Sequence, residues 1–456
     1  MLKNLRHNRF RLAQAGFISF WYLSLFPGRV GFDTVYAFNM MRDGESTDWW
    51  TALYFRTLQV FTLNGQVLYI FSLVGILLLS YGLFYFVDSL GLNSKLSELA
   101  ILFTIANPIF GVFAVTVQHD VLQASGTFIV LGILVRILRN IHIPGRQLTF
   151  LLILSSFLLG QSRTGQLTIV VSTMVIGILL NNRVLIGLVL TLNVLLFQLS
   201  LAGIDTTITE KGKFLPFISD LKCIAQHPEN EISSKGWVFL NSIAPKEEWI
   251  KPQSCAEITN LYFTDNIDYE KIELDFAFIS NYLSIISAHP AIFAMGHIQK
   301  SAAALPPPFF QGIQNQVDLN YANPIGLGTN IALQSGPSFL HPSIDDPLVR
   351  IDIPLLKPLE TLAQIPTFLV NQASWFWAWG GLWLWPILFF FTFVLDFRRI
   401  RLLYALHPII ILHLVMIVIG VAPTGRHMQP TIILGIFTTA YLILKMGTLL
   451  RDISFR

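Results

Sequence analysis

Long apolar segments alternate with short polar breaks along this chain of 456 residues. A helix that crosses a bilayer needs about 20 mostly apolar residues, so the shorter segments must include their polar ends in the same helix. The pattern therefore predicts an all-α polytopic membrane protein with about ten transmembrane helices. The apolar segments are 12–26, 66–87, 99–117, 121–138, 148–160, 167–180, 184–201, 375–395, 402–421 and 431–444.

The composition agrees with this pattern, because 53% of the residues are hydrophobic and only 12% are charged. Soluble domains average about 25% charged residues. The first apolar segment follows a basic stretch but lacks the small-residue cleavage site of a signal peptide, so we expect it to be retained as a span.

The positions of Lys and Arg predict the orientation, because short cytoplasmic loops of membrane proteins carry an excess of these residues. With ten spans, the basic clusters at 3–11, 136–146, 398–401 and 445–456 all fall on one side. We therefore expect both termini in the cytoplasm, in a bacterial inner or plasma membrane. Losing one span would place either the cluster at 398–401 or the N-terminal cluster outside.

Three regions follow from this topology. Residues 1–202 form an N-terminal transmembrane module with a long first external loop at 28–65, where short interfacial helices are expected. Residues 203–370 form a mixed extracytoplasmic insert between helices 7 and 8, and residues 371–456 form the C-terminal transmembrane helices. The insert holds 18 acidic and 10 basic side chains. That balance argues against a nucleic-acid partner.

The insert also contains both cysteines, Cys223 and Cys255. A disulfide is stable outside the cytoplasm, so the predicted location favours a bridge between them. Two free, structural cysteines are the alternative.

Four polar breaks separate apolar segments on the predicted external side, and ionisable groups gathered at one membrane face indicate a functional site. The breaks are 27–33, 118–120, 161–165 and 425–427.

The acidic residues of the breaks are candidates for catalysis. Asp33, just beyond the first span, can act as a general base toward an acceptor, or it can cap a short helix at 34–41. Asp120, with His119, can supply a second acid or a ligand for a divalent metal. The simpler interpretation of Asp120 is a cap for the following span.

The basic residues of the breaks are candidates for substrate binding. Arg163 and Arg426, with the neighbouring His427, lie on the side where anchoring cations are rare. An Arg guanidinium matches the geometry of a phosphate and stays charged, so a lipid-linked phosphate is a suitable partner. The alternative is that these side chains only anchor helix ends at the membrane surface.

These residues, in this order and on one side, resemble the C-type (GT-C superfamily) polytopic membrane glycosyltransferases, which use polyprenyl-phosphate sugars as donors. The segment from Phe26 to Asp33 resembles the Pro-Gly-x-x-x-x-Asp start of a bacterial, uncharacterised branch. The second loop of that branch often ends in Lys-Asp, where this chain has His119-Asp120. The resemblance covers the first 200 residues best and the last 80 more loosely, and it does not extend to the insert.

The resemblance implies a fold, a reaction and a set of partners. Asp33 would activate the acceptor, Asp120 with His119 would be the second external acid, and Arg163 and Arg426 would hold the donor phosphate. The sugar would pass from the polyprenyl-phosphate donor to a glycan, lipid or protein acceptor with inversion. No cofactor is certain, and the acidic residues and His119 leave a divalent metal possible. Two other functions fit the sequence: a surface-glycan polymerase or ligase, and a transporter or flippase of a lipid-linked substrate.

Overall fold

Helices account for most of the residues described by the computed structural model of this protein. The description covers residues 2–30, 34, 37–38, 40–41, 43–44, 51–92, 94–201, 207–227, 231–251, 255, 267, 272–301, 356, 358–359, 361–363, 380–398, 400–419 and 428–454. The only two strands among them, β1 (Arg29–Val30) and β2 (Thr116–Val117), form a short parallel pair.

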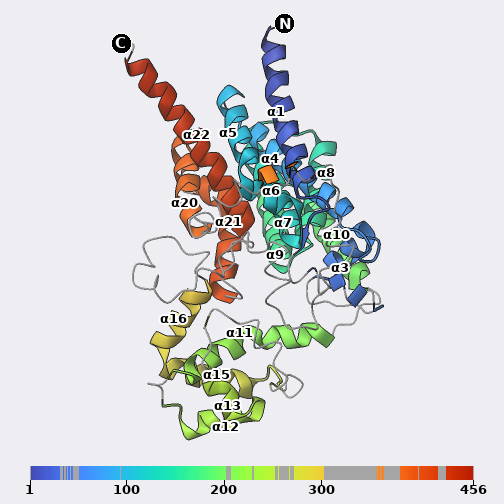
Figure 1. The fold of residues 1–456 in the computed structure, drawn as a ribbon. Helices are drawn as coiled ribbons and strands as arrows, with labels where there is room; N and C mark the ends of the chain where they lie inside the picture. Colours follow the sequence, from blue (N-terminus) through green and yellow to red (C-terminus); the bar gives the residue numbers. More distant parts are fainter. Residues whose placement is uncertain are drawn as a thin grey trace.

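Most helices belong to one apolar bundle (Figure 1). Its elements are α1 (Leu2–Ser24), α3 (Ala52–Phe61), α4 (Tyr69–Ser89), α5 (Ser94–Ala106), α6 (Pro108–Val115), α7 (His119–Leu138), α8 (Gly145–Leu159), α9 (Arg163–Leu180), α10 (Arg183–Leu201), α20 (Gly380–Phe389), the π-helical turn η4 (Phe390–Val394), α21 (Ile400–Ile419) and α22 (Gln429–Ser454).

Five of the described helices are long and apolar enough to cross a membrane, and the number rises to seven if each of two bent helix pairs is one span. The prediction of a helical chain is therefore confirmed, and several of its helices could span a membrane. The number of ten spans stays a prediction. The segment 99–117 is not one straight helix, because α5 and α6 meet at an angle of 65°. Asn107 ends the first helix and caps the second by accepting a hydrogen bond from the Ile109 amide at 2.9 Å.

The two chain termini lie at the same end of the bundle, and the described helices between residues 207 and 301 lie beyond the opposite end (Figure 1). We call the first of these the terminal end and the second the insert end. Helix α3 lies near the insert end, to one side of the bundle.

One hydrophobic core joins the early helices to the C-terminal ones. Phe86 of α4 contacts both groups of helices. Its ring centroid lies 6.2 Å from that of Phe128, 6.4 Å from that of Phe391 and 6.2 Å from that of Phe437. Close backbone approach supports the same packing: a Cβ added at Gly82 would lie 2.6 Å from the Ser125 carbonyl oxygen. Residues 1–202 and 371–456 thus share a core.

The insert has a second core of its own. Trp249 is buried there and its indole N–H donates to the Leu240 carbonyl at 2.9 Å, while Phe278 packs edge-on against Phe214 and Phe239. The helices of the insert are α11 (Thr207–Ala225), α12 (Ser234–Ile243), α13 (Lys246–Ile250), α15 (Phe276–Ala288) and α16 (Pro290–Lys300). The predicted disulfide is confirmed: Cys223 and Cys255 are bonded, with their Cα atoms 5.4 Å apart.

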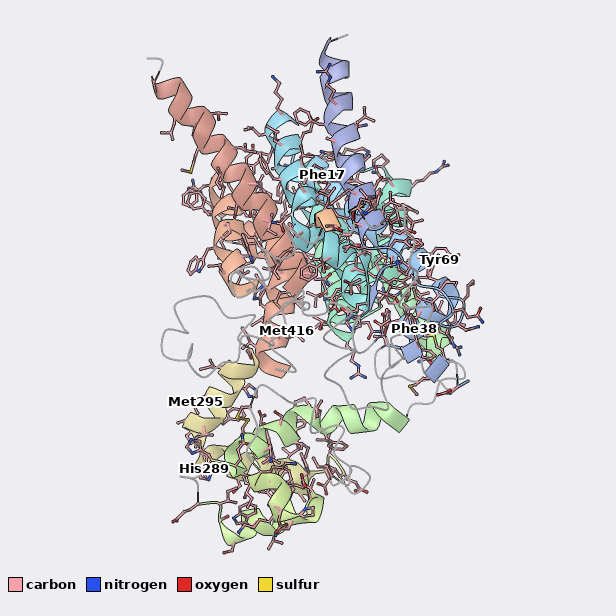
Figure 2. The ribbon with its side chains drawn as sticks, in the orientation of Figure 1. Phe17, Phe38, Tyr69, His289, Met295 and Met416 are labelled. Carbon is pink, nitrogen blue, oxygen red and sulfur yellow. A yellow bond between two sulfur atoms is a disulfide. The ribbon has the colours of Figure 1, made fainter. Side chains whose placement is uncertain are left out.

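The insert touches the bundle through α16 and the end of α21. Figure 2 shows Met295 of α16 on the insert side of this junction and Met416 of α21 on the bundle side. Ser301 donates to the Met416 or Ile417 carbonyl at 3.2 or 3.1 Å, and His297 Nε2 lies 3.2 Å from the Val418 carbonyl oxygen.

Candidate functional site

The first and second polar breaks meet through the two strands. Arg29 pairs with Thr116 and Val30 with Val117. Further along the first break, the Thr34 hydroxyl donates a hydrogen bond to the Val117 carbonyl. Asp33 itself lies outside the described residues. Its described neighbours Val30 and Thr34 both contact Val117, which directly precedes the second break.

Glycine is required at the exit of α1. Gly28 has φ +127°, and a Cβ there would lie 1.8 Å from Ser72 Oγ and 3.2 Å from the Val115 carbonyl oxygen. A side chain would therefore clash as well as strain the backbone. The Pro-Gly start of the first break has a structural role, which is to turn the chain closely past α4 and α6.

The second break forms the start of α7. Gln118 is extended and precedes the helix, so Asp120 lies in the first turn and is not the cap. A carboxylate in that position interacts favourably with the helix dipole. The side chain of Asp120 is 4% exposed, and its Oδ1 lies 3.3 Å from His119 Nδ1. On the other side, the His119 ring meets the Tyr54 ring edge-on, with 5.3 Å between centroids.

Gln118 has an unusual environment for a polar side chain. It is only 3% exposed, and neither its Oε1 nor its Nε2 has a hydrogen-bond partner within the described part of the chain. A buried group left in this way costs about 1–3 kcal/mol. A buried carboxamide beside His119 and Asp120, with both amide atoms lacking a partner among the described residues, is suited to bind a polar ligand. Sequence reasoning included Gln118 in the break but gave it no role.

The third break is hydrogen-bonded to α7 and to the first external loop. Ser162 caps α9 by accepting from the Gly165 amide at 2.9 Å, and its hydroxyl donates to Gln123 Oε1 at 2.8 Å. Gln123 is one turn beyond Asp120 on α7. The Gln161 carbonyl accepts from the Thr51 hydroxyl of the first loop at 2.9 Å. Arg163, the first residue of α9, is exposed to solvent beside this junction.

The fourth break, with Arg426 and His427, lies outside the described residues. Gln429 follows it at the start of α22, is fully buried, and has no partner for either amide atom among the residues described. Sequence reasoning missed Gln429, as it missed Gln123 and Tyr54. Polarity next to a break was the available signal, but burial could not be read from the sequence.

The metal hypothesis can be tested only in part. Among the described residues, no three His, Cys, Asp or Glu side chains lie close enough together to hold a metal ion. Since Asp33 falls outside that set, the possible divalent metal of the sequence analysis is still untested.

The fold is a bundle of apolar helices, several of which could span a membrane, with buried polar side chains at the starts of α7 and α22. Comparisons of the chain with protein-family models, with curated proteins and with solved structures find no match.

Proposed function

We propose that this protein is a membrane glycosyltransferase that moves a sugar from a polyprenyl-phosphate carrier to an acceptor at the extracytoplasmic face. The observation that supports it best is the polar cluster at the start of α7. There, Gln118 is buried, has no hydrogen-bond partner among the described residues, and lies beside His119 and the buried Asp120. Polar groups with this arrangement in an apolar bundle are expensive, and they are usual at substrate sites of membrane proteins.

The proposed chemistry assigns a role to each residue of the breaks. Asp33 takes the proton of the acceptor nucleophile, which attacks the anomeric carbon as the bond to the phosphate oxygen breaks, with inversion. Arg163, Arg426 and His427 hold the phosphate and stabilise the charge that builds on it as it leaves. Asp120, positioned by His119, is the second acid and binds sugar hydroxyls together with Gln118. The insert covers the site and selects the acceptor.

Asp33 provides the direct test of this mechanism. We expect Asp33→Asn to abolish transfer of radiolabelled sugar from a panel of polyprenyl-phosphate sugars into membrane acceptors, with expression and insertion unchanged. Asp43→Asn is the matched control, because Asp43 is an exposed carboxylate of the same loop. Normal transfer by the Asp33 variant would remove its role as base. Failure of the wild-type protein to consume any donor in the panel would overturn the glycosyltransferase proposal.

The topology is part of the proposal: ten spans, both termini in the cytoplasm, and the insert outside. The position of both termini at one end of the bundle and of the insert at the other supports an even number of crossings. A disulfide in the insert supports an oxidising compartment.

Accessibility labelling tests this orientation. Gly145, at the terminal end, and Ser287, in the insert, are both exposed. In intact cells, a membrane-impermeant maleimide should label Ser287→Cys, whereas Gly145→Cys should react only after permeabilisation. The reverse result would contradict the proposed orientation.

A further inference from the structure

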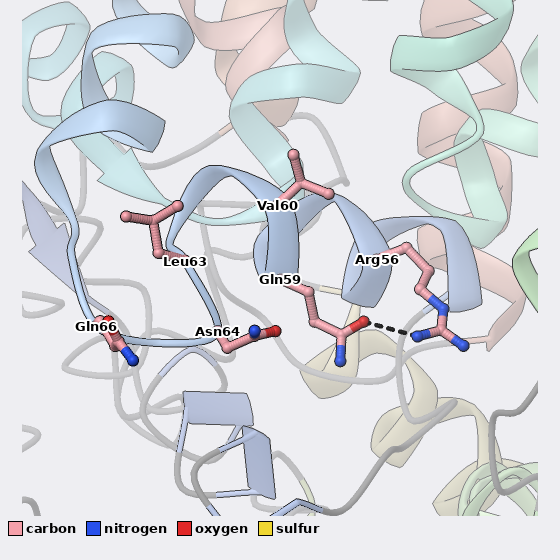
Figure 3. Close-up of a pocket in the computed structure, with 6 residues that line it drawn as sticks. All are labelled: Arg56, Gln59, Val60, Leu63, Asn64 and Gln66. Carbon is pink, nitrogen blue, oxygen red and sulfur yellow. Dashed lines mark hydrogen bonds between the residues drawn. The ribbon is translucent and has the colours of Figure 1, made fainter.

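An open depression lies at the end of α3, on the side of that helix away from the polar cluster. Its volume is about 690 Å³. Figure 3 shows the side chains that line it, which come from the last turns of α3 and from the turn that follows. They are Arg56, Gln59, Val60, Leu63, Asn64 and Gln66.

The lining combines one cation, three carboxamides and two aliphatic side chains. A guanidinium favours phosphate oxygens, which it can bind with two parallel hydrogen bonds. Carboxamides both donate and accept, as hydroxyl groups do. Arg56 Nη1 donates to Gln59 Oε1 at 2.9 Å, so the guanidinium is oriented along the helix.

The turn after α3 is held in a strained conformation to form the second wall. Leu63, Asn64 and Gly65 have φ values of 51°, 57° and 77°. A left-handed backbone is unfavourable for leucine in particular, and such strain gathers at functional sites. The turn is fixed by hydrogen bonds from the Asn64 amide to the Gln59 carbonyl at 2.8 Å and from the Gly65 amide to Thr62 Oγ1 at 3.0 Å.

Helix α3 is firmly anchored on its other face. Tyr54, Phe55 and Leu58 are buried in the bundle, and Tyr54 meets the His119 ring. The depression is thus separated from the polar cluster by about the diameter of a helix, roughly 10–12 Å. Val60 and Leu63, which are 68% and 50% exposed, place apolar surface at its rim.

We propose that this depression binds the phosphate-bearing, hydroxylated headgroup of a membrane lipid. Arg56 holds the phosphate, Gln59, Asn64 and Gln66 bind the hydroxyls, and the exposed Val60 and Leu63 contact the start of the hydrocarbon chain. This binding site is additional to the proposed sugar-transfer site, and lipid can occupy it whether or not transfer takes place.

The test is a titration of the purified full-length protein without turnover. The probes are dihexanoyl phosphatidylglycerol, geranyl phosphate and, as a zwitterionic control, dihexanoyl phosphatidylcholine. We expect saturable binding of at least one of the first two probes, at least tenfold tighter than the control. Their relative affinity distinguishes a bilayer lipid from an isoprenoid carrier as the source.

Two variants locate the binding in the depression. Arg56→Gln should weaken the preferred probe at least tenfold, whereas Arg146→Gln, which removes an exposed cation at the terminal end, should not. Asn64→Gly keeps the left-handed backbone while removing the carboxamide, and should weaken binding severalfold without changing the melting temperature. Equal binding of anionic and zwitterionic probes, or unchanged binding by both depression variants, would overturn the proposal.

Discussion

Gln118 and Gln123 lie close together at the start of α7, but they differ in hydrogen bonding. Gln123 accepts a hydrogen bond from Ser162 at 2.8 Å, whereas the Gln118 amide has no partner in the described part of the protein. Both side chains are buried: Gln118 is 3% exposed and Gln123 is 6% exposed. The structure therefore separates a glutamine that holds helices together from one that is available to a ligand.

This contrast predicts opposite effects for the same substitution. Gln118→Met removes an unsatisfied polar group while keeping its volume, so the free energy of unfolding should rise by about 1–3 kcal/mol. Sugar transfer should fall at least tenfold, chiefly through a higher KM for the donor. Thermal unfolding in detergent and the transfer assay measure the two effects.

Gln123→Met is the control for this experiment. It leaves the Ser162 hydroxyl without its acceptor, so stability should fall by about 1 kcal/mol. If Gln118→Met were as destabilising as Gln123→Met, the Gln118 amide would have a structural partner, and its proposed role in binding would be wrong.

At the scale of elements, the α5–α6 break shows what the sequence could and could not reveal. Hydropathy predicts one span over 99–117, but Asn107 and Pro108 are a helix stop and start signal inside it. The bend gives α6 a new direction, and the chain then leaves it as β2 beside β1. The local signal was present in the sequence. The pairing with β1 depends on a partner 87 residues away in the chain and could not be read from local pattern.

The insert contains an element whose stability should depend on pH. Lys222 of α11 is buried, and its ammonium donates to the Glu248 carbonyl. Burial, aided by the charge of Lys251, lowers the Lys222 pKa from 10.5 to about 8, although Glu248 opposes the shift. Between these two values the unfolded chain binds a proton that the folded insert has lost. The free energy of unfolding should therefore rise as the pH increases from about 8, whereas below about pH 8 the destabilisation caused by this group should be constant.

Tyr282 sets the upper limit of this window. Burial and the neighbouring Asp220 raise the pKa of Tyr282 above its ordinary value of 10.0, so above about pH 10 this group makes stability fall as pH rises.

Hydrogen exchange of peptides from α11 to α13, compared at pH 7.5 and 9.5, measures the effect of Lys222. Lys222→Met should be more stable than the wild type at pH 7.5. Its free energy of unfolding should not show the rise between pH 7.5 and 9.5 that the wild type shows. An equal increase in both proteins would mean that Lys222 is not its cause.

At the scale of the whole molecule, the structure bears on the arrangement of the ends of the bundle, and the sides of the membrane stay a prediction. Both termini do lie at one end and the insert at the other. Hydrogen bonds connect residues next to three of the four breaks: Thr34 donates to Val117, and Ser162 donates to Gln123. Thr51 of the first loop donates to the Gln161 carbonyl. Asp33, Arg426 and His427 stay predictions. The docking of the insert on α21 had no signal in the sequence, because it uses backbone carbonyls that any residue would supply.

That docking depends on a histidine with contacts on both sides of the junction. His297 of α16 lies with Nδ1 3.1 Å from Asp220 Oδ1 and with Nε2 3.2 Å from the Val418 carbonyl oxygen. Asp220 also accepts the Tyr282 hydroxyl at 2.7 Å, so the histidine connects the core of the insert to the end of α21. Ser301 adds the only other side-chain hydrogen bond to the end of α21 within the described residues.

We expect His297→Leu to loosen the insert from the bundle. The variant loses the hydrogen bond to the Val418 carbonyl and the close approach of Nδ1 to the buried Asp220 carboxylate, so the free energy of unfolding of the insert should fall by about 0.5–1.5 kcal/mol. Amide hydrogen exchange in peptides that cover 414–419 and 294–301 should become faster, with little change in α4 and α7. His289→Leu is the matched control, because His289 makes no side-chain hydrogen bond within the described part of the insert. If the two variants exchanged alike, the insert would be held by its apolar contacts alone, since a leucine can replace those of His297 but cannot bind Asp220 and Val418.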